Sequence, residues 1–368
     1  MDRRKIAFCD FGLNPAISGS LRPQLEAAFP ENPLEVISLG ELVRVRNWRN
    51  LVDVLLHYGP EISCGRKRFN DCVLRTRNSF ESIRRALRHR LTADSYRFTF
   101  QTGSRVDGSV PGIPHFVYTD HTHLANRHYP EPPPNWKFST EWIELERKIY
   151  HRATRVFTFS SNIARSLVED YGVEPAKIRC AYAGGNLPRG PGGPVRVPGA
   201  KTILFVGMEW ERKGGPLLVA AFRRVLRKHP DAKLLIVGCT PAVSVPNCEI
   251  FGLLPLDEVA AHFRGANIFC MPTRCEPFGI VFVEAMLAGL PVVATRLGAL
   301  PEMVRDGVNG FLIESGDERG LAAALDTLLA DSKMCAEFGA RGATLAEQQY
   351  TWENSVAIMR AEVLNAGA

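Results

Sequence analysis

Short apolar runs alternate with helical segments along the second half of the chain. Residues 202–206 form one such run and end at Gly207, as expected of a buried parallel strand. Similar spacing predicts further strands at 233–237, 268–271 and 291–295, and helices at 216–228, 257–264, 281–288 and 320–331. Strands and helices that alternate in this way predict an α/β fold built on a doubly wound parallel sheet.

The first half repeats this rhythm less regularly. Strands are predicted at 5–9, 34–38, 95–101, 114–119 and 155–159, and helices at 48–57, 72–91, 139–152 and 161–171. A stretch rich in proline and glycine separates the halves and predicts a linker. We therefore expect two Rossmann-like domains facing each other across a cleft. The predicted parts are an N-terminal domain (1–186), the linker (187–199), a C-terminal domain (200–349) and a final helix (350–368) able to cross back.

Composition limits the class of protein. The 368 residues are 45% hydrophobic and 23% charged, as in globular proteins, and no run nears the roughly 18 apolar residues of a membrane-spanning helix. The first residues lack a signal-peptide apolar region, and nine scattered cysteines without metal-ligand spacing suggest a reducing compartment. We expect a cytoplasmic protein, with peripheral contact at the inner face of a membrane left open.

Charge is distributed unevenly between the halves. Residues 1–200 carry 29 Lys/Arg and 20 Asp/Glu, whereas residues 201–368 carry 16 and 19. A basic first half beside a mildly acidic second half suggests that the halves meet different partners. No nucleic-acid-binding motif accompanies the basic half, so we do not expect a nucleic-acid partner.

The most informative motif follows the predicted strand 268–271. Its loop carries Glu276, Pro277 and Phe278, and it leads at Gly279 and Ile280 into a helix that contains Glu284. Backbone N–H groups at the start of a helix bind phosphate, and a glycine there allows close approach. The two glutamates are placed to accept hydrogen bonds from sugar hydroxyls. The competing interpretation is a capping Glu276 and a solvated Glu284.

A second motif, Gly207-Met-Glu-Trp-Glu-Arg212-Lys213-Gly214-Gly215, also lies between a strand and a helix. Two adjacent cations flanked by glycines can neutralise a diphosphate. Taken alone, this sequence is typical of an exposed helix start. Behind a buried strand, and together with the first motif, they favour binding of a diphosphate-bearing donor molecule at Gly207, Arg212 and Lys213.

These motifs resemble retaining glycosyltransferases of family four, which have the two-domain GT-B fold. The resemblance covers residues 200–330 and rests on EPFGIVFVEAMLAGLPVVAT (276–295) with its Glu-x7-Glu spacing, on GALPE (298–302) and on NGFL (309–312). It implies that Glu276 contacts the transferred sugar, that Glu284 holds the ribose, and that Arg212 and Lys213 grip the diphosphate. Residues 277–280 complete the implied donor site.

The resemblance says less about the first half. It implies a histidine near the transferred sugar just beyond a strand, where His121 is our choice and His123 competes. Residues Gln101, Thr102 and Asp120 also follow predicted strands. Gly12 and Asn14 lie in a segment similar to the family's first loop, although its usual glycine pair is missing. We expect these five residues on the acceptor side, with ordinary turns as the alternative.

The expected activity is metal-independent, cofactor-free transfer of a sugar, by default from a UDP-sugar, onto a glycan or lipid-linked acceptor. No Asp-x-Asp motif offers a metal site. Alternatives are a GT-B epimerase or phosphorylase, or an inactive nucleotide-sugar-binding scaffold. The basic helix predicted at 72–91 either lies on an anionic membrane or packs its apolar stripe against its own sheet.

Overall fold

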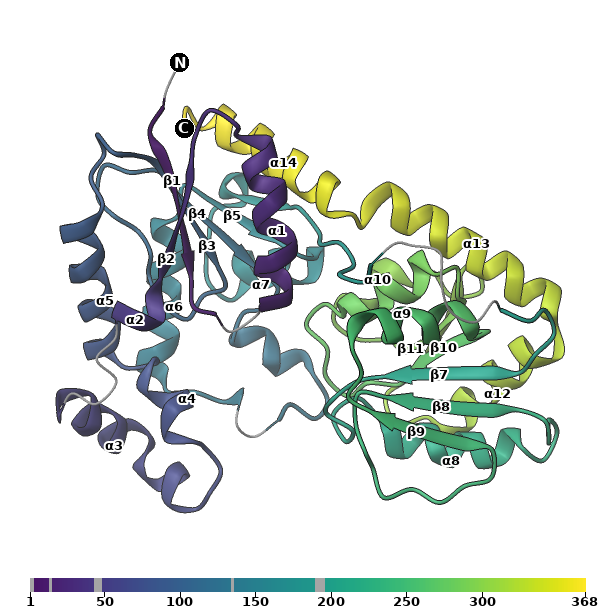
Figure 1. Cartoon of the computed structure of the whole chain (residues 1–368). Coiled ribbons are helices and arrows are strands. Elements are labelled where there is room, and N and C mark those ends of the chain that lie inside the picture. The colour runs from purple at the N-terminus through teal and green to yellow at the C-terminus, as the bar shows by residue number, and fades with distance from the viewer. Residues whose placement is uncertain (1–2, 13–14, 43–47, 134–135, 189–195) are drawn as a thin grey trace. The chain divides into compact units, whose positions relative to one another are not determined.

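The computed structural model describes residues 3–12, 15–42, 48–133, 136–188 and 196–368 (Figure 1). The chain divides into two compact units. The first contains residues 1–127, 133–182 and 352–368, and the second contains residues 128–132 and 183–351. Each unit is built on its own six-stranded parallel sheet, so the predicted pair of Rossmann-like domains is confirmed.

The sheet of the first unit has the order β2-β1-β3-β4-β5-β6. Its strands are β1 (Lys5–Asp10), β2 (Leu34–Ser38), β3 (Tyr96–Thr102), β4 (His115–Thr119), β5 (Arg155–Thr158) and β6 (Ile178–Cys180). Its α-helices are α1 (Pro15–Ala28), α2 (Leu39–Leu42), α3 (Trp48–Ser63), α4 (Phe69–Val73), α5 (Arg77–Arg90), α6 (Thr140–Arg152), α7 (Ser161–Glu169) and α14 (Trp352–Asn365), with 3₁₀ turns at Leu124–His128 and Pro175–Lys177. Phenylalanine rings of β1, β3 and β5 stack over one face of the sheet, Phe8 on Phe100 and Phe100 on Phe157.

The final helix, α14, belongs to the first unit. It runs beside α1 (Figure 1), where Arg360 Nε donates to the carbonyl of Ala28 at 2.9 Å. Glu362 accepts from Arg155 at 3.1 Å and from Arg179 at 2.7 Å, which ties α14 to β5 and β6.

The sheet of the second unit has the order β12-β11-β10-β7-β8-β9. Its strands are β7 (Thr202–Val206), β8 (Lys233–Val237), β9 (Cys248–Gly252), β10 (Ile268–Met271), β11 (Val292–Thr295) and β12 (Gly310–Ile313). Its helices are α8 (Gly215–Val225), α9 (Leu256–Gly265), α10 (Ile280–Leu287), α11 (Leu300–Met303), α12 (Glu318–Ala330) and α13 (Ser332–Gln349). The short strands β9 and β12 were not predicted, because β9 has an exposed polar pattern and β12 follows a turn with little apolar sequence before it.

One predicted helix differs from the structure. Residues 72–91 do not form a single helix, since α4 ends at Val73 and α5 begins at Arg77. Thr76 lies between them in an extended conformation, and its side chain accepts a hydrogen bond from Ser79 N as an N-cap. Phe80, Ile83 and Leu87 of α5 are buried, so the interpretation of α5 as a helix packed on its own domain is confirmed. No helix among the described residues is long and apolar enough to cross a membrane.

Candidate active site

Two loops of the second unit follow adjacent parallel strands. β7 pairs with β10, for instance through Ile203 and Ile268, although β8 and β9 lie between them in sequence. The sheet therefore grows in opposite directions from this pair, which is the switch point where ligands bind in open parallel sheets. Residues 207–214 after β7 and 272–279 after β10 occupy this switch point.

The two predicted cations meet carboxylates of their own unit. The Lys213 ammonium donates a hydrogen bond to Glu276 Oε2, and Arg212 Nη1 lies 4.0 Å from the same oxygen. Arg212 also donates to both carboxylate oxygens of Glu209 at 2.8 Å, and this hydrogen bonding holds the pKa of Glu209 below its usual range. Two cations and two carboxylates thus form a cluster without net charge. Glu209 was not predicted, although its i,i+3 spacing to Arg212 was visible in the sequence.

Glycine allows the two loops to touch. Gly214 has φ of 77°, and a Cβ there would lie 1.8 Å from the carbonyl oxygen of Pro272. The loops are also joined by hydrogen bonds, because Arg274 N donates to the carbonyl of Arg212 at 2.8 Å and Arg212 Nη1 donates to the carbonyl of Cys275 at 2.7 Å. A side chain at position 214 would separate the cations from the loop of Glu276.

Helix α10 begins directly after this loop. Its N-cap residue is Gly279, with φ of 91° and no capping side chain. A Cβ at Gly279 would lie 2.6 Å from the ring of Phe282 and 3.1 Å from Glu276 Cγ, so glycine brings the carboxylate close to the helix start. The first N–H groups of a helix lack intrahelical partners, and at Gly279 and Ile280 they suit an anion.

The main chain of Glu276 is fixed on two sides, by Tyr129, which the sequence did not reveal, and by Gly298 of the GALPE motif. The hydroxyl of Tyr129 donates to the Glu276 carbonyl at 2.9 Å, and a Cβ at Gly298 would lie 2.3 Å from that oxygen. Next to it, the ring of Phe278 is buried with its centroid 6.2 Å from that of Tyr350. Phe278 therefore anchors the loop, and Pro277 connects it to Glu276.

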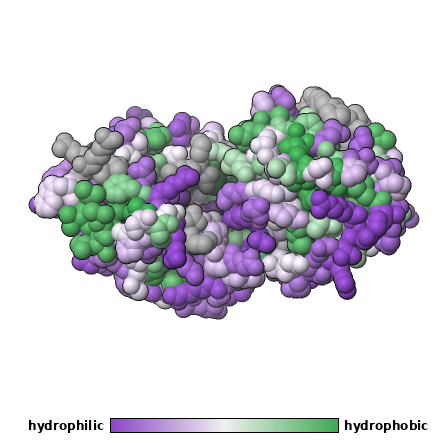
Figure 2. Space-filling model, turned by 90° about the horizontal axis from the view of Figure 1, so that it is seen from below, coloured by the Kyte–Doolittle hydropathy of each residue, from purple (hydrophilic) through white to green (hydrophobic). Residues whose placement is uncertain are grey.

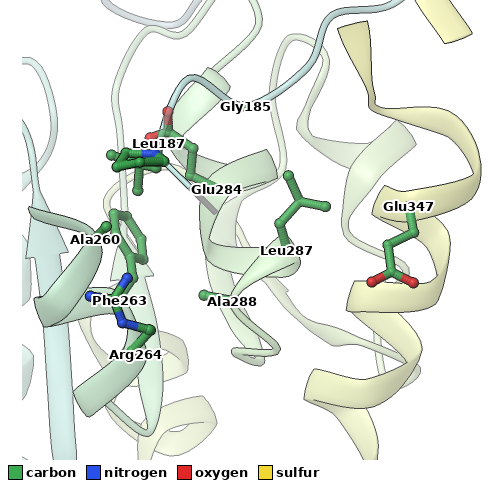
Figure 3. A pocket seen from close by; sticks show the side chains of 10 residues that line it. Gly185, Leu187, Ala260, Phe263, Arg264, Glu284, Leu287, Ala288 and Glu347 are labelled. Atoms are coloured by element: carbon green, nitrogen blue, oxygen red, sulfur yellow. The ribbon is translucent and has the colours of Figure 1, made fainter. Parts of the chain in front are cut away.

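Glu284 lies one turn into α10 and lines a separate cavity of about 240 Å³ (Figure 3). Its Oε1 accepts from the backbone N–H of Asn186 at 3.0 Å, and its side chain extends toward Leu187. Burial raises the pKa of Glu284 to about 7, against the opposing effect of the backbone amides of Asn186 and Leu187. The cavity lies between α9, α10, α13 and the segment 185–188, and it is lined mainly by apolar groups.

The predicted histidine lies in the first unit, just beyond β4. Burial lowers the pKa of His121 to about 3, so its imidazole is neutral at pH 7. Its Nδ1 is buried and has no hydrogen-bond partner among the described residues. The ring packs edge-on against those of His123 and Trp136, with centroids 5.5 Å and 5.3 Å away.

His123, the competing candidate, forms a hydrogen bond with a buried carboxylate. Its Nδ1 lies 2.8 Å from Oε1 of Glu146, which also accepts from Ser104 Oγ at 2.8 Å and from the hydroxyls of Tyr150 and Tyr171. Burial acts to raise the pKa of Glu146, but His123 and the hydroxyl donors outweigh it and hold the pKa at about 2. The Nδ1 atom of His123 is therefore occupied by Glu146, whereas the buried Nδ1 of His121, the other candidate, has no partner among the described residues.

A cavity of about 110 Å³, lined by both charged and apolar side chains, lies at the switch point of the first sheet, between β1 and β3. Thr102 and Asp120, both predicted on the acceptor side, line it together with Asp10 and Arg105, which were not predicted. Gly12 has φ of 70° and donates its N–H to Asp10 Oδ1 at 3.1 Å. Asn14 lies outside the described residues.

Gln101 has a different role from its neighbours. Its Nε2 donates to the carbonyls of Gly103 and Val106 at 2.7 Å each, and its Oε1 accepts from Gly108 N at 2.7 Å. All of these bonds hold the loop 103–108 that carries Arg105. Gln101 thus shapes the cavity wall from the buried side of the loop.

The predicted residues fall into three groups. Gly207, Arg212, Lys213 and residues 276–280 lie together at the switch point of the second sheet, and Glu284 lies at its own cavity. His121 and the acceptor-side residues belong to the first unit. In the ranges that the structure describes, no three His, Cys, Asp or Glu side chains cluster closely enough to hold a metal ion.

Comparison with known proteins adds family evidence. Residues 200–331 match the family model described as glycosyl transferases group 1, and residues 82–189 match that of glycosyltransferase family 4. The first match contains the switch-point residues of the second unit. The second contains His121, Glu146 and most of the acceptor-side cavity.

Individual proteins show the same likeness. A D-inositol 3-phosphate glycosyltransferase of Acidothermus cellulolyticus is 31% identical over 68% of this chain, which spans 62% of that relative. A GDP-mannose-dependent alpha-(1-6)-phosphatidylinositol monomannoside mannosyltransferase of Mycolicibacterium smegmatis is 34% identical over 38% of this chain and 42% of its own length. In fold, sucrose-phosphate synthase of Thermosynechococcus elongatus covers the whole of both chains with a TM-score of 0.70 at 17% identity. In sequence the chain is thus similar to glycosyltransferases of group 1 and family 4, and in fold it is similar to GT-B glycosyltransferases.

Proposed function

We propose that this chain is a retaining glycosyltransferase that moves a sugar from a nucleoside-diphosphate sugar onto a hydroxyl of a glycan or lipid-linked acceptor. The observation that carries the proposal is the convergence of Arg212, Lys213 and the start of α10 at one switch point. These are fixed positive groups suited to a diphosphate. Their carboxylate partners explain how the site stays neutral without a ligand.

Donor binding would rearrange the neutral cluster. The diphosphate is more highly charged than a carboxylate, so it competes with Glu209 for Arg212 and with Glu276 for Lys213. Glu276, once released from Lys213, can accept hydrogen bonds from the hydroxyls of the sugar. Glu284 would hold the ribose, whose hydroxyls replace the backbone N–H of Asn186 as donors.

The chemical step needs stabilisation of charge on the leaving group. The bond between the anomeric carbon and the diphosphate breaks, the acceptor oxygen bonds to the same carbon, and the acceptor proton passes to the leaving phosphate oxygen. Arg212, Lys213 and the α10 amides stabilise the growing negative charge. The acceptor approaches from the face that the leaving group vacates, which retains the configuration. No protein nucleophile, metal ion or cofactor is assigned a role.

The acceptor is proposed to bind the first unit. Its cavity combines carboxylates of Asp10 and Asp120, which accept from hydroxyl groups, with the guanidinium of Arg105, which suits an anionic group. The names of the relatives, which contain inositol phosphate and phosphatidylinositol, fit a polyol phosphate of this kind. The neutral His121 would lie toward the transferred sugar.

The test combines binding with product analysis. Thermal-shift screening should find stabilisation by one class of nucleotide sugar, with UDP-sugars as the first choice and GDP-mannose as the second because one relative is named for it. Incubation with inositol phosphate or phosphatidylinositol should then yield a new α-glycoside and free nucleoside diphosphate. Epimerised donor without a glycoside would indicate an epimerase, and binding without turnover would indicate a scaffold. In a separate incubation with a glycan and inorganic phosphate, release of a sugar 1-phosphate would indicate a phosphorylase.

A further inference from the structure

Helix α3 presents large apolar side chains to solvent. Trp48, Leu51, Val52, Leu55 and Leu56 follow the i, i+3, i+4, i+7, i+8 spacing of one helix face, and their exposed fractions run from 44% for Val52 to 73% for Leu56. A surface helix ordinarily turns such a face toward its own core. A contiguous exposed apolar face of this kind marks an interaction surface.

Polar contacts hold α3 in this orientation. On its inner side Asn50 accepts from Ser79 Oγ at 3.2 Å, and Asp53 accepts from Asn78 N at 3.1 Å. The hydroxyl of Tyr58 lies 2.9 Å from Ser139 Oγ. Rotation of α3 to bury its leucines would break all three contacts, so the outward direction of the apolar face is fixed by the fold.

Cations accompany both ends of the apolar face. At its start the guanidinium of Arg49 lies 5.5 Å from the ring centroid of Trp48, and just beyond its end Arg66 and Arg68 are exposed. Residues 48–90 contain ten Lys/Arg and four Asp/Glu, a net charge of +6. Figure 2 shows a hydrophobic patch bordered by hydrophilic surface in the region where Figure 1 places α3.

We propose that α3 docks this chain on an anionic lipid surface, with Trp48 and the leucines in the headgroup region. A helix with an apolar stripe, a tryptophan and flanking arginines has the features of helices that lie in the plane of a bilayer interface. Its 16 residues form a rod about 24 Å long. Anionic headgroups complement the arginines at its ends. The docking does not depend on the proposed transferase activity.

Vesicle co-sedimentation of the full chain tests this proposal. Wild type should bind vesicles of phosphatidylcholine and phosphatidylglycerol, less at high salt, and bind pure phosphatidylcholine more weakly. The double variant L55E/L56E should reduce partitioning into the vesicles about tenfold or more, since it places two charges where the proposal inserts two exposed leucines into the lipid. R66Q/R68Q should weaken binding to the anionic vesicles alone.

Matched controls distinguish membrane docking from unfolding and from non-specific adsorption to vesicles. L253E/L256E makes the same change at two exposed leucines of the second unit and should leave vesicle binding unchanged. Both leucine variants should keep the wild-type circular dichroism and Tm, and L55E/L56E should keep donor hydrolysis. Failure of wild type to bind anionic vesicles, or equal binding by L55E/L56E, would overturn the proposal. A wild-type dimer that L55E/L56E converts to a monomer, without vesicle binding, would assign the face to a second copy instead.

Discussion

The side-chain ammonium of Lys213 donates a hydrogen bond to the carboxylate of Glu276, 63 residues away in sequence. Both side chains are largely buried, at 13% and 7% exposure. The pair joins the two loops of the switch point and keeps its charges balanced. A diphosphate that binds the ammonium of Lys213 would displace the carboxylate of Glu276. Under the proposed mechanism, the displaced carboxylate is then free to bind the sugar, which couples recognition of the phosphates to recognition of the sugar.

The first prediction concerns Glu276. E276A should lower the rate of sugar transfer far more than it weakens binding of the free nucleoside diphosphate, because the carboxylate is proposed to contact the sugar and to compete with the phosphate for Lys213. Steady-state kinetics and calorimetry with the nucleoside diphosphate measure the two effects. If nucleotide binding falls while transfer persists, the roles assigned to Glu276 and Glu284 are reversed.

Arg212 should contribute mainly to the transition state. R212A should slow turnover roughly 10²- to 10³-fold, the typical effect of removing one fixed donor from a developing anion. The matched control is R274A, which removes an exposed arginine from the neighbouring loop. Near-normal kcat in R212A would remove the guanidinium from the mechanism.

Glu209 should act as a competitor of the diphosphate. E209Q keeps the size of the side chain but removes the charge paired with Arg212, so the affinity for nucleoside diphosphate should rise about two- to fivefold, the scale of an exposed ion pair. E211Q makes the same change two residues away and should have little effect. Calorimetry measures the affinity of each variant for nucleoside diphosphate. Weaker binding by E209Q would show that Glu209 holds the Arg212 side chain in the orientation that the ligand needs.

Glu284 should make stability depend on pH. Because burial raises its pKa from 4.5 to about 7, the folded state holds a proton that the unfolded state releases between these values. The contribution of Glu284 to the free energy of unfolding is therefore greatest below pH 4.5, declines as the pH rises from 4.5 to 7, and is lost above pH 7. E284Q should have a higher Tm than wild type at pH 8, with the difference shrinking toward pH 5.

Scanning fluorimetry from pH 5 to pH 8 measures this difference. E347Q, at another carboxylate that lines the same cavity, is the matched control and should follow wild type. A difference between E284Q and wild type that stays constant with pH would contradict the assignment. If Glu284 binds ribose as a carboxylate, nucleotide affinity should also rise as pH increases through 7.

Glu146 should stabilise the first unit in the opposite pH range. Its pKa is held at about 2, so its contribution is present above pH 4.5 and is lost as pH falls toward 2. E146A leaves the hydroxyls of Ser104, Tyr150 and Tyr171 without their acceptor and should cost roughly 3 kcal/mol or more at pH 7. Urea unfolding at pH 7 measures this loss, with E144A, at an exposed carboxylate of α6, as control. Equal stability of the two variants would show that the network around Glu146 is not needed.

The sequence predicted the second unit better than the first. Its central strands are short buried runs such as 202–206 and 268–271, whose apolar pattern is continuous because helices cover both faces of the sheet. The helix break at Thr76 was missed because the apolar spacing continues through it, and a cap formed by one threonine leaves little trace in periodicity. Glu146 was missed because a buried carboxylate on an amphipathic helix is indistinguishable in sequence from a solvated one.

By itself, the sequence determined the alternation of strands and helices, the adjacent cations Arg212 and Lys213, the glycine at the start of the helix after Phe278, and the spacing of the two glutamates, because these depend on residue type over short distances. Only the tertiary structure decided that Glu209 and Glu276 neutralise the cations, that His123 is committed to Glu146, and that α3 instead of α5 exposes its apolar face. Each of these depends on which residues distant in sequence come into contact, and the order of strands in a sheet sets those contacts.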